Sequence, residues 1–401
     1  MDFDFIKPLV KPAKTKILLL VMDGLGGLPA EKDGETELEA ANTPNLDQLT
    51  EQGICGLHEP IGPGITPGSG PSHLALFGYD PQKYQIGRGV LAASGIDFEL
   101  NSGDVAARGN FCTVDKGGVV TDRRAGRIST EKNAELCVLL EKISVPGIEI
   151  FIKPVKEHRF LLVIRGADLS EHVLDTDPQA VGEKPLEAKP SSADGERTAA
   201  LLNTFIEKAA TVLKDQHLAN MVLLRGFSML PGWPKFHEVF GLKSAAIAAY
   251  PMYLGLAKLV GMKTYPSENK IDDELEILKK HWADFDFFYV HIKSIDSAGE
   301  DGDYFRRIRL IEEVDSRIPL IRQLDPDVVI VTGDHSTPAI LKAHSWHPVP
   351  VILWSKYCRP DSVDRFAERA CVSGSLGPHF PAVDLMPLAL ANALRLDKFG
   401  A

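Results

Sequence analysis

Five stretches of this chain are near-continuous runs of apolar residues, which is the pattern of strands buried on both faces of a parallel sheet. Apolar residues at helical spacing lie between these runs, and the alternation of strand and helix predicts a doubly wound, mostly parallel α/β sheet. Residues 1–15 show neither pattern, and we expect an irregular leader there. The predicted strands are 16–22, 245–249, 287–292, 328–331 and 349–354, and the predicted helices are 43–52, 252–260, 272–282, 304–324 and 385–394.

The middle of the chain has a different pattern. Residues 148–152 and 159–164 are typical of two hairpin strands, and residues 130–142 and 194–214 of two longer helices. Paired strands beside helices, without strand–helix alternation, are typical of an α+β unit. We therefore predict a cap domain over 97–238, inserted into a discontinuous core formed by 1–96 and 239–401.

Acidic residues follow three of the apolar runs. Asp23 comes after the first run, Asp296 after the run 287–292, and Asp334 with His335 after the run 328–331. The carboxyl ends of parallel strands meet at one edge of a sheet, and ligands of α/β proteins bind there. Carboxylate oxygens beside an imidazole nitrogen suit a divalent metal ion, so we expect a metal site at this edge.

A segment rich in glycine and proline, residues 62–74, contains Ser69. Such composition usually means a surface loop. However, the segment leads into the apolar run Leu74-Ala75-Leu76-Phe77, so Ser69 is expected near a helix N-terminus, where an ionised oxygen or a phosphate is stabilised. Flanking glycines would let a phosphorus atom approach a nucleophilic serine closely.

Arginines are concentrated in the predicted cap. Arg108 lies near Asn110 in a predicted strand, and Arg123, Arg124 and Arg127 fall within five residues of one another. Guanidinium groups bind phosphate and carboxylate through two parallel hydrogen bonds, which suits a small anionic substrate. A solvated, charged turn is the alternative for such a run.

Composition narrows the classes of protein that the chain can belong to. Of 401 residues, 44% are hydrophobic and 25% charged, which is ordinary for a globular protein, and the formal net charge of -11 disfavours nucleic acid as a partner. The apolar runs are too short to span a membrane and the N-terminus has no signal pattern, so we expect no membrane partner and a cytoplasmic location. The five cysteines are scattered without a Cys-x-x-Cys pair, which disfavours a zinc–thiolate site.

Motifs distributed over nearly the whole chain resemble one family, the archaeal-type, cofactor-independent phosphoglycerate mutases of the alkaline phosphatase superfamily. No single motif is decisive, and the resemblance depends on their order and spacing. The motifs are Asp23-Gly24, residues 66–81, Arg108-Gly109-Asn110-Phe111, residues 122–127, Val290-His291-Ile292-Lys293 and Thr332-Gly333-Asp334-His335.

The resemblance implies two divalent metal ions beneath a serine nucleophile, Mn²⁺ first, with Mg²⁺, Co²⁺ or Zn²⁺ as alternatives, and no 2,3-bisphosphoglycerate. Where the family has a histidine ligand this chain has Glu300, which would favour harder ions; His347 is the alternative compensating ligand. Lys243 matches a lysine that contacts the transferring phosphoryl group. The implied ligands of one metal are Asp23, Ser69, Asp334 and His335, those of the other Asp296, His344 and Glu300, and the implied substrate-binding residues Arg108, Asn110, Arg123, Arg124 and Arg127.

The implied reaction is the interconversion of 2-phosphoglycerate and 3-phosphoglycerate through a phosphoserine. A phosphatase, or a phosphotransferase acting on another small hydroxy acid such as homoserine, would use the same scaffold. A catalytically inactive binding protein, with Glu300 marking a decayed metal site, is the alternative outside enzymes. The sequence leaves the oligomeric state open.

Overall fold

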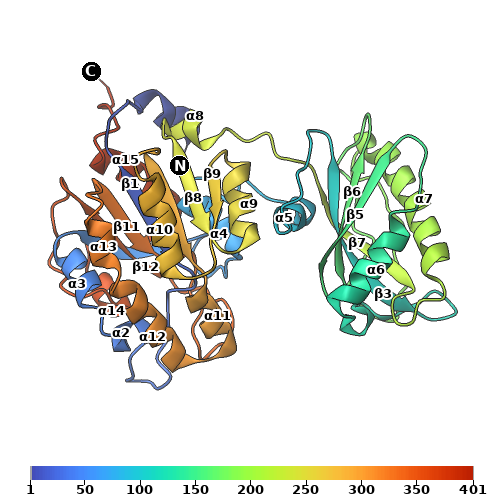
Figure 1. The fold of residues 1–401 in the computed structure, drawn as a ribbon, viewed down its shortest axis with the longest axis horizontal. Coiled ribbons are helices and arrows are strands. Elements are labelled where there is room, and N and C mark those ends of the chain that lie inside the picture. The colour runs from blue at the N-terminus through green and yellow to red at the C-terminus, as the bar shows by residue number, and fades with distance from the viewer. Residues whose placement is uncertain (1, 401) are drawn as a thin grey trace. The chain divides into compact units, whose positions relative to one another are not determined.

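The computed structural model describes residues 2–400 and divides the chain into two compact units (Figure 1). The core unit contains the residues up to Gln85 and those from Trp233 onward, and the cap unit is Ile86–Gly232. The cap therefore begins at 86 and not at the predicted 97. The reason is the helix Arg88–Ser94, which packs on the cap sheet: Val90 N–H donates to Ser228 Oγ at 3.0 Å, and Gly89 lies too close to Ala106 for any side chain.

The core unit is built on one eight-stranded sheet, in the order β13-β2-β12-β11-β1-β10-β8-β9. The neighbours are parallel except β12, which is antiparallel to both β11 and β2. This confirms the predicted doubly wound, mostly parallel α/β fold. The strands are β1 (Ile17–Met22), β2 (Ile54–Glu59), β8 (Ser244–Ala248), β9 (Lys263–Pro266), β10 (Phe287–Ile292), β11 (Val328–Thr332), β12 (Val349–Ser355) and β13 (Gly377–Pro381).

Apolar side chains of the central strands alternate between the two faces of this sheet, so both faces must be covered. On one face Leu18 and Leu20 pack in a core with residues of α3, α10, α12 and α13. On the other face, the rings of His73 in α4 and Phe236 in α8 contact Tyr289 and Phe287. The helices are α1 (Phe3–Ile6), α2 (Glu37–Ala40), α3 (Pro44–Glu51), α4 (Ser69–Leu76), α8 (Phe236–Phe240), α9 (Pro251–Leu259), α10 (Ile271–His281), α11 (Ser294–Asp301), α12 (Tyr304–Asp315), α13 (Ile318–Arg322), α14 (Glu368–Cys371) and α15 (Leu385–Asn392), with 3₁₀ turns η1 (Lys7–Leu9) and η4 (Ala382–Asp384).

Two local predictions were wrong. The leader is not irregular throughout, because α1 forms there and its Phe3 and Ile6 are buried. The long helix predicted over 304–324 is two helices, α12 and α13, separated at Ser316 and Arg317. Pro319 lacks the N–H that a continuous helix would need at that position, and it is accommodated in the first turn of α13.

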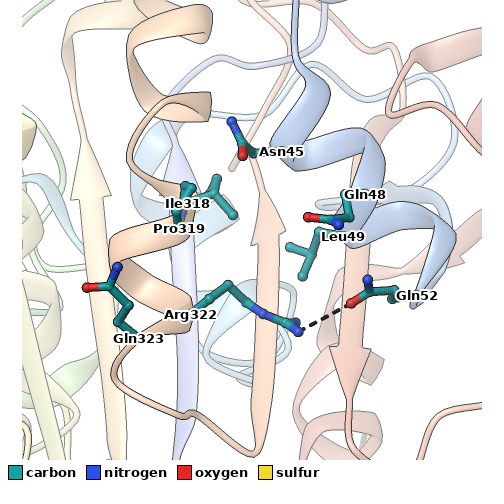
Figure 2. A pocket seen from close by; sticks show the side chains of 8 residues that line it. All are labelled: Asn45, Gln48, Leu49, Gln52, Ile318, Pro319, Arg322 and Gln323. Carbon is teal, nitrogen blue, oxygen red and sulfur yellow. Dashed lines mark hydrogen bonds between the residues drawn. The ribbon is translucent and has the colours of Figure 1, made fainter.

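A surface pocket of about 310 Å³ lies between α3 and α13 (Figure 2). Several of its lining residues carry amide side chains. The Arg322 guanidinium donates to Gln52 Oε1 at 3.2 Å, and its Cζ lies 3.7 Å from the centroid of the Trp354 ring. The Arg322 side chain thereby joins the two helices over the sheet. None of the predicted metal ligands lines this pocket.

The cap unit has a five-stranded antiparallel sheet, in which β4-β3-β6-β5 are consecutive and β7 pairs with β3. Its helices α6 and α7 pack on one face around Phe111, Phe160 and Phe205, and residues alternating with these, such as Arg108 and Asn110, belong to the other face. The elements are α5 (Arg88–Ser94), β3 (Val105–Val114), β4 (Val120–Asp122), α6 (Thr130–Leu140), β5 (Glu149–Lys156), β6 (Arg159–Arg165), α7 (Glu196–Leu213) and β7 (Met221–Ser228), with η2 (Ala125–Arg127) and η3 (Ala193–Gly195). In the described chain, residues 2–400, no helix has the length and apolar character needed to cross a membrane.

Candidate metal centre and nucleophile

Three adjacent strands of the core sheet carry the acidic residues to one edge. In the sheet β1 lies between β10 and β11 and runs parallel to both, so the residues that follow these strands are neighbours. Asp23 follows β1 directly, Asp334 follows β11 after one glycine, and Asp296 lies in the first turn of α11, just beyond β10. All three carboxylates are almost fully buried.

The first candidate group consists of Asp23, Asp334 and His335, whose ligand atoms all lie within 4.8 Å of one another. His335 Nε2 is 3.4 Å from Asp23 Oδ1 and 3.1 Å from Asp334 Oδ2. Ser69 Oγ lies 3.5 Å from the same nitrogen. The structure therefore brings together all four residues predicted for one metal, with the serine hydroxyl among them.

The electrostatics of this group fit a bound cation. Burial would raise the pKa of Asp23, but the imidazole of His291, whose Nε2 lies 3.2 Å from Asp23 Oδ2, and the ammonium of Lys293 hold it well below its ordinary value. Burial, and then the charge of Asp23, raise the pKa of Asp334 well above its ordinary value. Two buried carboxylates resist ionising together, and a divalent ion between them would remove that conflict.

Two atoms of this group are also free to bind a cation. Asp23 Oδ1 is buried and, among the described residues, accepts no hydrogen bond. Burial lowers the pKa of His335 to about 4, so its imidazole is neutral near pH 7 and has a lone pair to offer. His335 Nδ1 lies 3.0 Å from Thr337 Oγ1, which leaves Nε2 as the ligand nitrogen.

The second candidate group consists of Asp296, His335 and His344. His344 Nε2 is 3.8 Å from Asp296 Oδ1, and the rings of His344 and His335 stack with their centroids 3.6 Å apart. His344 Nδ1 lies 3.0 Å from the carbonyl oxygen of Pro67. Because His335 Nε2 faces the first group, Asp296 and His344 are the only ligands that the second group has of its own among residues 2–400.

Three residues predicted for the site are not brought to it. Glu300 is exposed on α11, and His347 Nδ1 contacts Ser345 Oγ at 3.0 Å; neither belongs to a candidate group. Lys243 was placed wrongly, because it precedes β8, at the opposite end of a strand parallel to β10. The strand β8 has five residues, so its two ends are about 16 Å apart. The ammonium of Lys243 lies over the ring of Phe285.

Lys293, which sequence reasoning did not assign to the site, takes the place expected of Lys243. Its Nζ is 3.1 Å from Asp23 Oδ2 and also pairs with Asp296 Oδ2, so it joins the two candidate groups. The signal was present in the sequence, because Lys293 directly follows β10, at the same edge as Asp23. Tyr253 was also missed; its hydroxyl donates to Asp23 Oδ2 at 2.6 Å.

Ser69 begins α4, as its position before an apolar run predicted. One helical turn later, His73 Nδ1 contacts the carbonyl oxygen of Ser69 at 2.8 Å and Asp334 Oδ2 at 3.3 Å. Ser72 Oγ donates to Asp334 Oδ2 at 3.4 Å. The first turn of α4 is therefore anchored to the candidate metal ligand Asp334, and this contact places the serine hydroxyl.

A cluster of arginines lies in the cap unit. Arg108 faces Arg225 across β3 and β7, and Asn110 faces Arg159 across β3 and β6. Burial, followed by the charges of Arg88, Arg159 and Arg225, lowers the pKa of Arg108 to about 10. Arg108 Nε and Asn110 Oδ1 are buried and have no hydrogen-bond partner in the part of the chain that the structure describes.

The other predicted arginines differ from one another in their surroundings. Arg123 forms two hydrogen bonds with Asp177, at 3.0 and 2.7 Å, and is thereby held by the protein itself. Arg124 and Arg127 are exposed, yet with Arg159 they contribute to lowering the pKa of the buried His158 to about 4, after burial itself. Arg159 and Arg225 were missed because only the strand pairing places them near Arg108, and Arg88 was missed because its place depends on the packing of α5 against β7.

Comparisons with known proteins match this chain to one family. A family model described as 2,3-bisphosphoglycerate-independent phosphoglycerate mutase matches residues 50–219. The chain is 50% identical over 408 residues to a probable enzyme of this description from Aquifex aeolicus, covering 99% of this chain and 100% of the relative. A Thermus thermophilus protein with the same description is 50% identical over 404 residues, covering 100% of this chain and 99% of the relative.

Two solved structures are similar over their whole length. The PH0037 protein from Pyrococcus horikoshii has a TM-score of 0.80 at 30% identity, covering 97% of this chain and 100% of that one. The cofactor-independent phosphoglycerate mutase from Thermoplasma acidophilum has a TM-score of 0.77 at 31% identity, covering 94% of this chain and 100% of that one.

Proposed function

The chain belongs to the family of 2,3-bisphosphoglycerate-independent phosphoglycerate mutases, and we propose that it interconverts 2-phosphoglycerate and 3-phosphoglycerate through a phosphoserine at residue 69. The observation that carries the proposal is the position of Ser69 Oγ, 3.5 Å from His335 Nε2, beside the carboxylates of Asp23 and Asp334. This reaction is a step of glycolysis and gluconeogenesis, which assigns the protein to the cytoplasm.

We propose two divalent ions, with Mn²⁺ as the first choice. Asp23, Asp334, His335 and Ser69 would hold one, and Asp296 and His344 the other. Bound cations supply two effects, a lower pKa of the serine hydroxyl and neutralisation of charge on the phosphoryl oxygens. A cation at this place is supported by the buried Asp23 Oδ1, which has no hydrogen-bond partner in the described part of the chain, and by the resistance of the two carboxylates to ionising together.

The protein's own residues account for the remaining requirements. Lys293 keeps its charge next to Asp23 and Asp296, and it can neutralise charge that develops on a phosphoryl group attached to Ser69. His73 and Ser72 hold the first turn of α4 against Asp334, so Ser69 needs little reorganisation before it attacks phosphorus. The N-terminal end of the helix also favours negative charge on the serine oxygen.

The cap would supply the groups that hold the glycerate. Arg108 presents a buried guanidinium nitrogen that has no partner among the described residues, which suits an anionic group that arrives with the substrate. Asn110 and the neighbouring Arg225 offer further hydrogen-bonding groups. Mutase activity requires that the dephosphorylated glycerate stay bound until it is rephosphorylated, and exclusion of water during this step separates a mutase from a phosphatase.

One assay distinguishes the proposed reaction from the alternatives. Purified protein is incubated with Mn²⁺ and 3-phosphoglycerate, and both 2-phosphoglycerate and free phosphate are followed. We expect 2-phosphoglycerate with little phosphate. Phosphate alone would indicate a phosphatase, transfer to added homoserine a phosphotransferase, and neither product an inactive binding protein.

The role of Ser69 is tested separately. Ser69→Ala should abolish the phosphoenzyme, detected by intact mass after rapid denaturation, and reduce turnover below detection. The matched control is Ser375→Ala, an exposed serine of the same unit, which should behave as wild type. Undiminished turnover in Ser69→Ala would show that the phosphoryl group takes another route.

A further inference from the structure

Two loops of the core unit carry the ligands of the first candidate group. The first loop, residues 23–27, follows β1, and the second, residues 333–339, follows β11. They lie against each other: Gly24 N–H donates to Asp334 Oδ1 at 3.2 Å, and Thr337 N–H donates to the carbonyl oxygens of Gly24 and Gly26. No side chain fits at Gly26, because its Cβ would lie 1.9 Å from Ser336 Oγ. The relative position of the loops therefore determines the spacing of the ligands.

One buried arginine bonds to the first loop. Arg307, on α12, is fully buried, and its Nη2 donates to three consecutive carbonyl oxygens, of Gly24 at 2.5 Å, Leu25 at 3.0 Å and Gly26 at 3.4 Å. These carbonyls directly follow the ligand Asp23. A single planar guanidinium thereby fixes the direction in which the chain leaves β1.

One buried carboxylate connects this arginine to the second loop. Glu37 Oε1 is 2.8 Å from Arg307 Nη1 and accepts a hydrogen bond from the backbone N–H of Ala339, also at 2.8 Å. Glu37 is fully buried as well. The chain of contacts thus runs from the residues after Asp23, through Arg307 and Glu37, to the residues after Asp334 and His335.

We propose that Arg307 and Glu37 are positioning residues for the metal centre. They touch neither the candidate ligand side chains nor a substrate site, and they act by holding the two ligand loops at the spacing that a cation requires. A buried ion pair is a costly way to stabilise a fold, because an apolar pair of similar volume often does as well. This inference rests on the proposed metal-dependent function.

Replacement of Arg307 should therefore weaken Mn²⁺ binding more than it lowers the stability of the fold. Residues that orient ligands without binding the metal typically change its affinity 10- to 100-fold when they are replaced. We therefore expect Arg307→Met to raise the dissociation constant for Mn²⁺ by roughly that factor. Arg307→Lys should be intermediate, because an ammonium keeps the charge but cannot bond three carbonyls and a carboxylate together.

The test is a titration of the purified protein with Mn²⁺, in which free Mn²⁺ is measured by electron paramagnetic resonance. The thermal midpoint without metal is recorded for each variant. The matched control is Arg395→Met, since Arg395 is also buried and bonds a backbone carbonyl, that of Thr15, away from both ligand loops. Its Mn²⁺ affinity should equal that of the wild type.

A double variant separates positioning from stability. Arg307→Met with Glu37→Leu replaces the buried ion pair by apolar side chains, and we expect it to recover much of the thermal midpoint without recovering Mn²⁺ affinity. Recovery of both would overturn the proposal, and so would wild-type affinity in a folded Arg307→Met. If Arg307→Met does not fold, Glu37→Gln, which keeps the acceptor for Ala339 N–H, replaces it and should weaken Mn²⁺ binding several-fold. Absence of Mn²⁺ binding by the wild type would instead contradict the metal site itself.

Discussion

Glu274 is a buried acid that the fold holds in its neutral form, so it should make stability depend on pH. The residue lies in the first turn of α10 and is 1% exposed. Ser267 Oγ donates to its Oε1 at 3.0 Å, but Oε2 has no partner among residues 2–400. Burial raises the pKa of Glu274 from 4.5 to about 7.

The sign and size of the effect follow from linkage. Below pH 4.5 the carboxyl is protonated in the folded and the unfolded chain, and above pH 7 it is ionised in both. Ionisation is harder in the folded state, so the stability that the neutral form provides is lost as the pH rises through 7. The total is about 3 kcal/mol, of which about 2 kcal/mol is lost between roughly pH 5.5 and 8.5.

The perturbation is Glu274→Gln, which keeps the acceptor for Ser267 and cannot ionise. Urea unfolding is measured at several pH values by tryptophan fluorescence. All four tryptophans, Trp233, Trp282, Trp346 and Trp354, belong to the core unit that contains Glu274, so the signal reports on that unit. The quantity of interest is the difference in unfolding free energy between variant and wild type, because other titrating groups cancel in it.

We expect this difference to change in favour of the variant by about 2 kcal/mol from roughly pH 5.5 to 8.5, whatever its absolute value. The unpartnered amide N–H of the variant adds a constant that does not depend on pH. Glu276→Gln, at an exposed position of the same helix, is the control and should show no such trend. A pH-independent difference for Glu274→Gln would refute the reasoning.

Three further predictions concern the candidate site. Lys293→Met should lower kcat/KM for 3-phosphoglycerate roughly 100-fold, because an ammonium that faces developing phosphoryl charge is removed, whereas Lys243→Met should stay within about twofold; equal losses would mean that the position at the strand end is irrelevant. Arg108→Lys should raise KM about tenfold with a smaller change in kcat, since a bidentate contact to a bound anion is lost; a change in kcat alone would contradict this role. Glu300→His should leave unchanged which of Mn²⁺, Mg²⁺ and Co²⁺ gives the highest activity, because Glu300 is exposed and belongs to neither candidate group; a changed order would place residue 300 at the metal.

The core of the fold could be predicted because its central strands are continuous runs of buried residues. Every residue of β1, β10 and β11 is buried, so the apolar runs mark the strands, and the polar residue that ends each run marks the edge where ligands gather. The group of Asp23, Asp334 and His335 follows from this pattern alone. The break between α12 and α13 was also visible, because Pro319 lies inside the predicted helix.

What escaped prediction depends on contacts between segments far apart in the chain. Arg225 joins Arg108 only because β7 pairs with β3. Tyr253 reaches Asp23 only because α9 packs against α4, with the rings of Tyr253 and His73 4.5 Å apart. The cap boundary depended on α5, a short helix whose place is decided by its packing on β3 and β7. Periodicity along one segment carries no information about such pairings.

The two lysines show how strand direction decides between residues that composition cannot distinguish. Lys243 precedes β8 and Lys293 follows β10, and because these strands are parallel the two residues lie at opposite ends of the sheet. A motif carried over from relatives identifies a residue type. The direction of the strand decides at which end of the sheet that residue lies. A lysine that neutralises phosphoryl charge must lie where the carboxylates lie, which favours Lys293. The same reasoning applies to any residue assigned to a parallel α/β site: its position before or after a strand is a physical test that needs only the sequence.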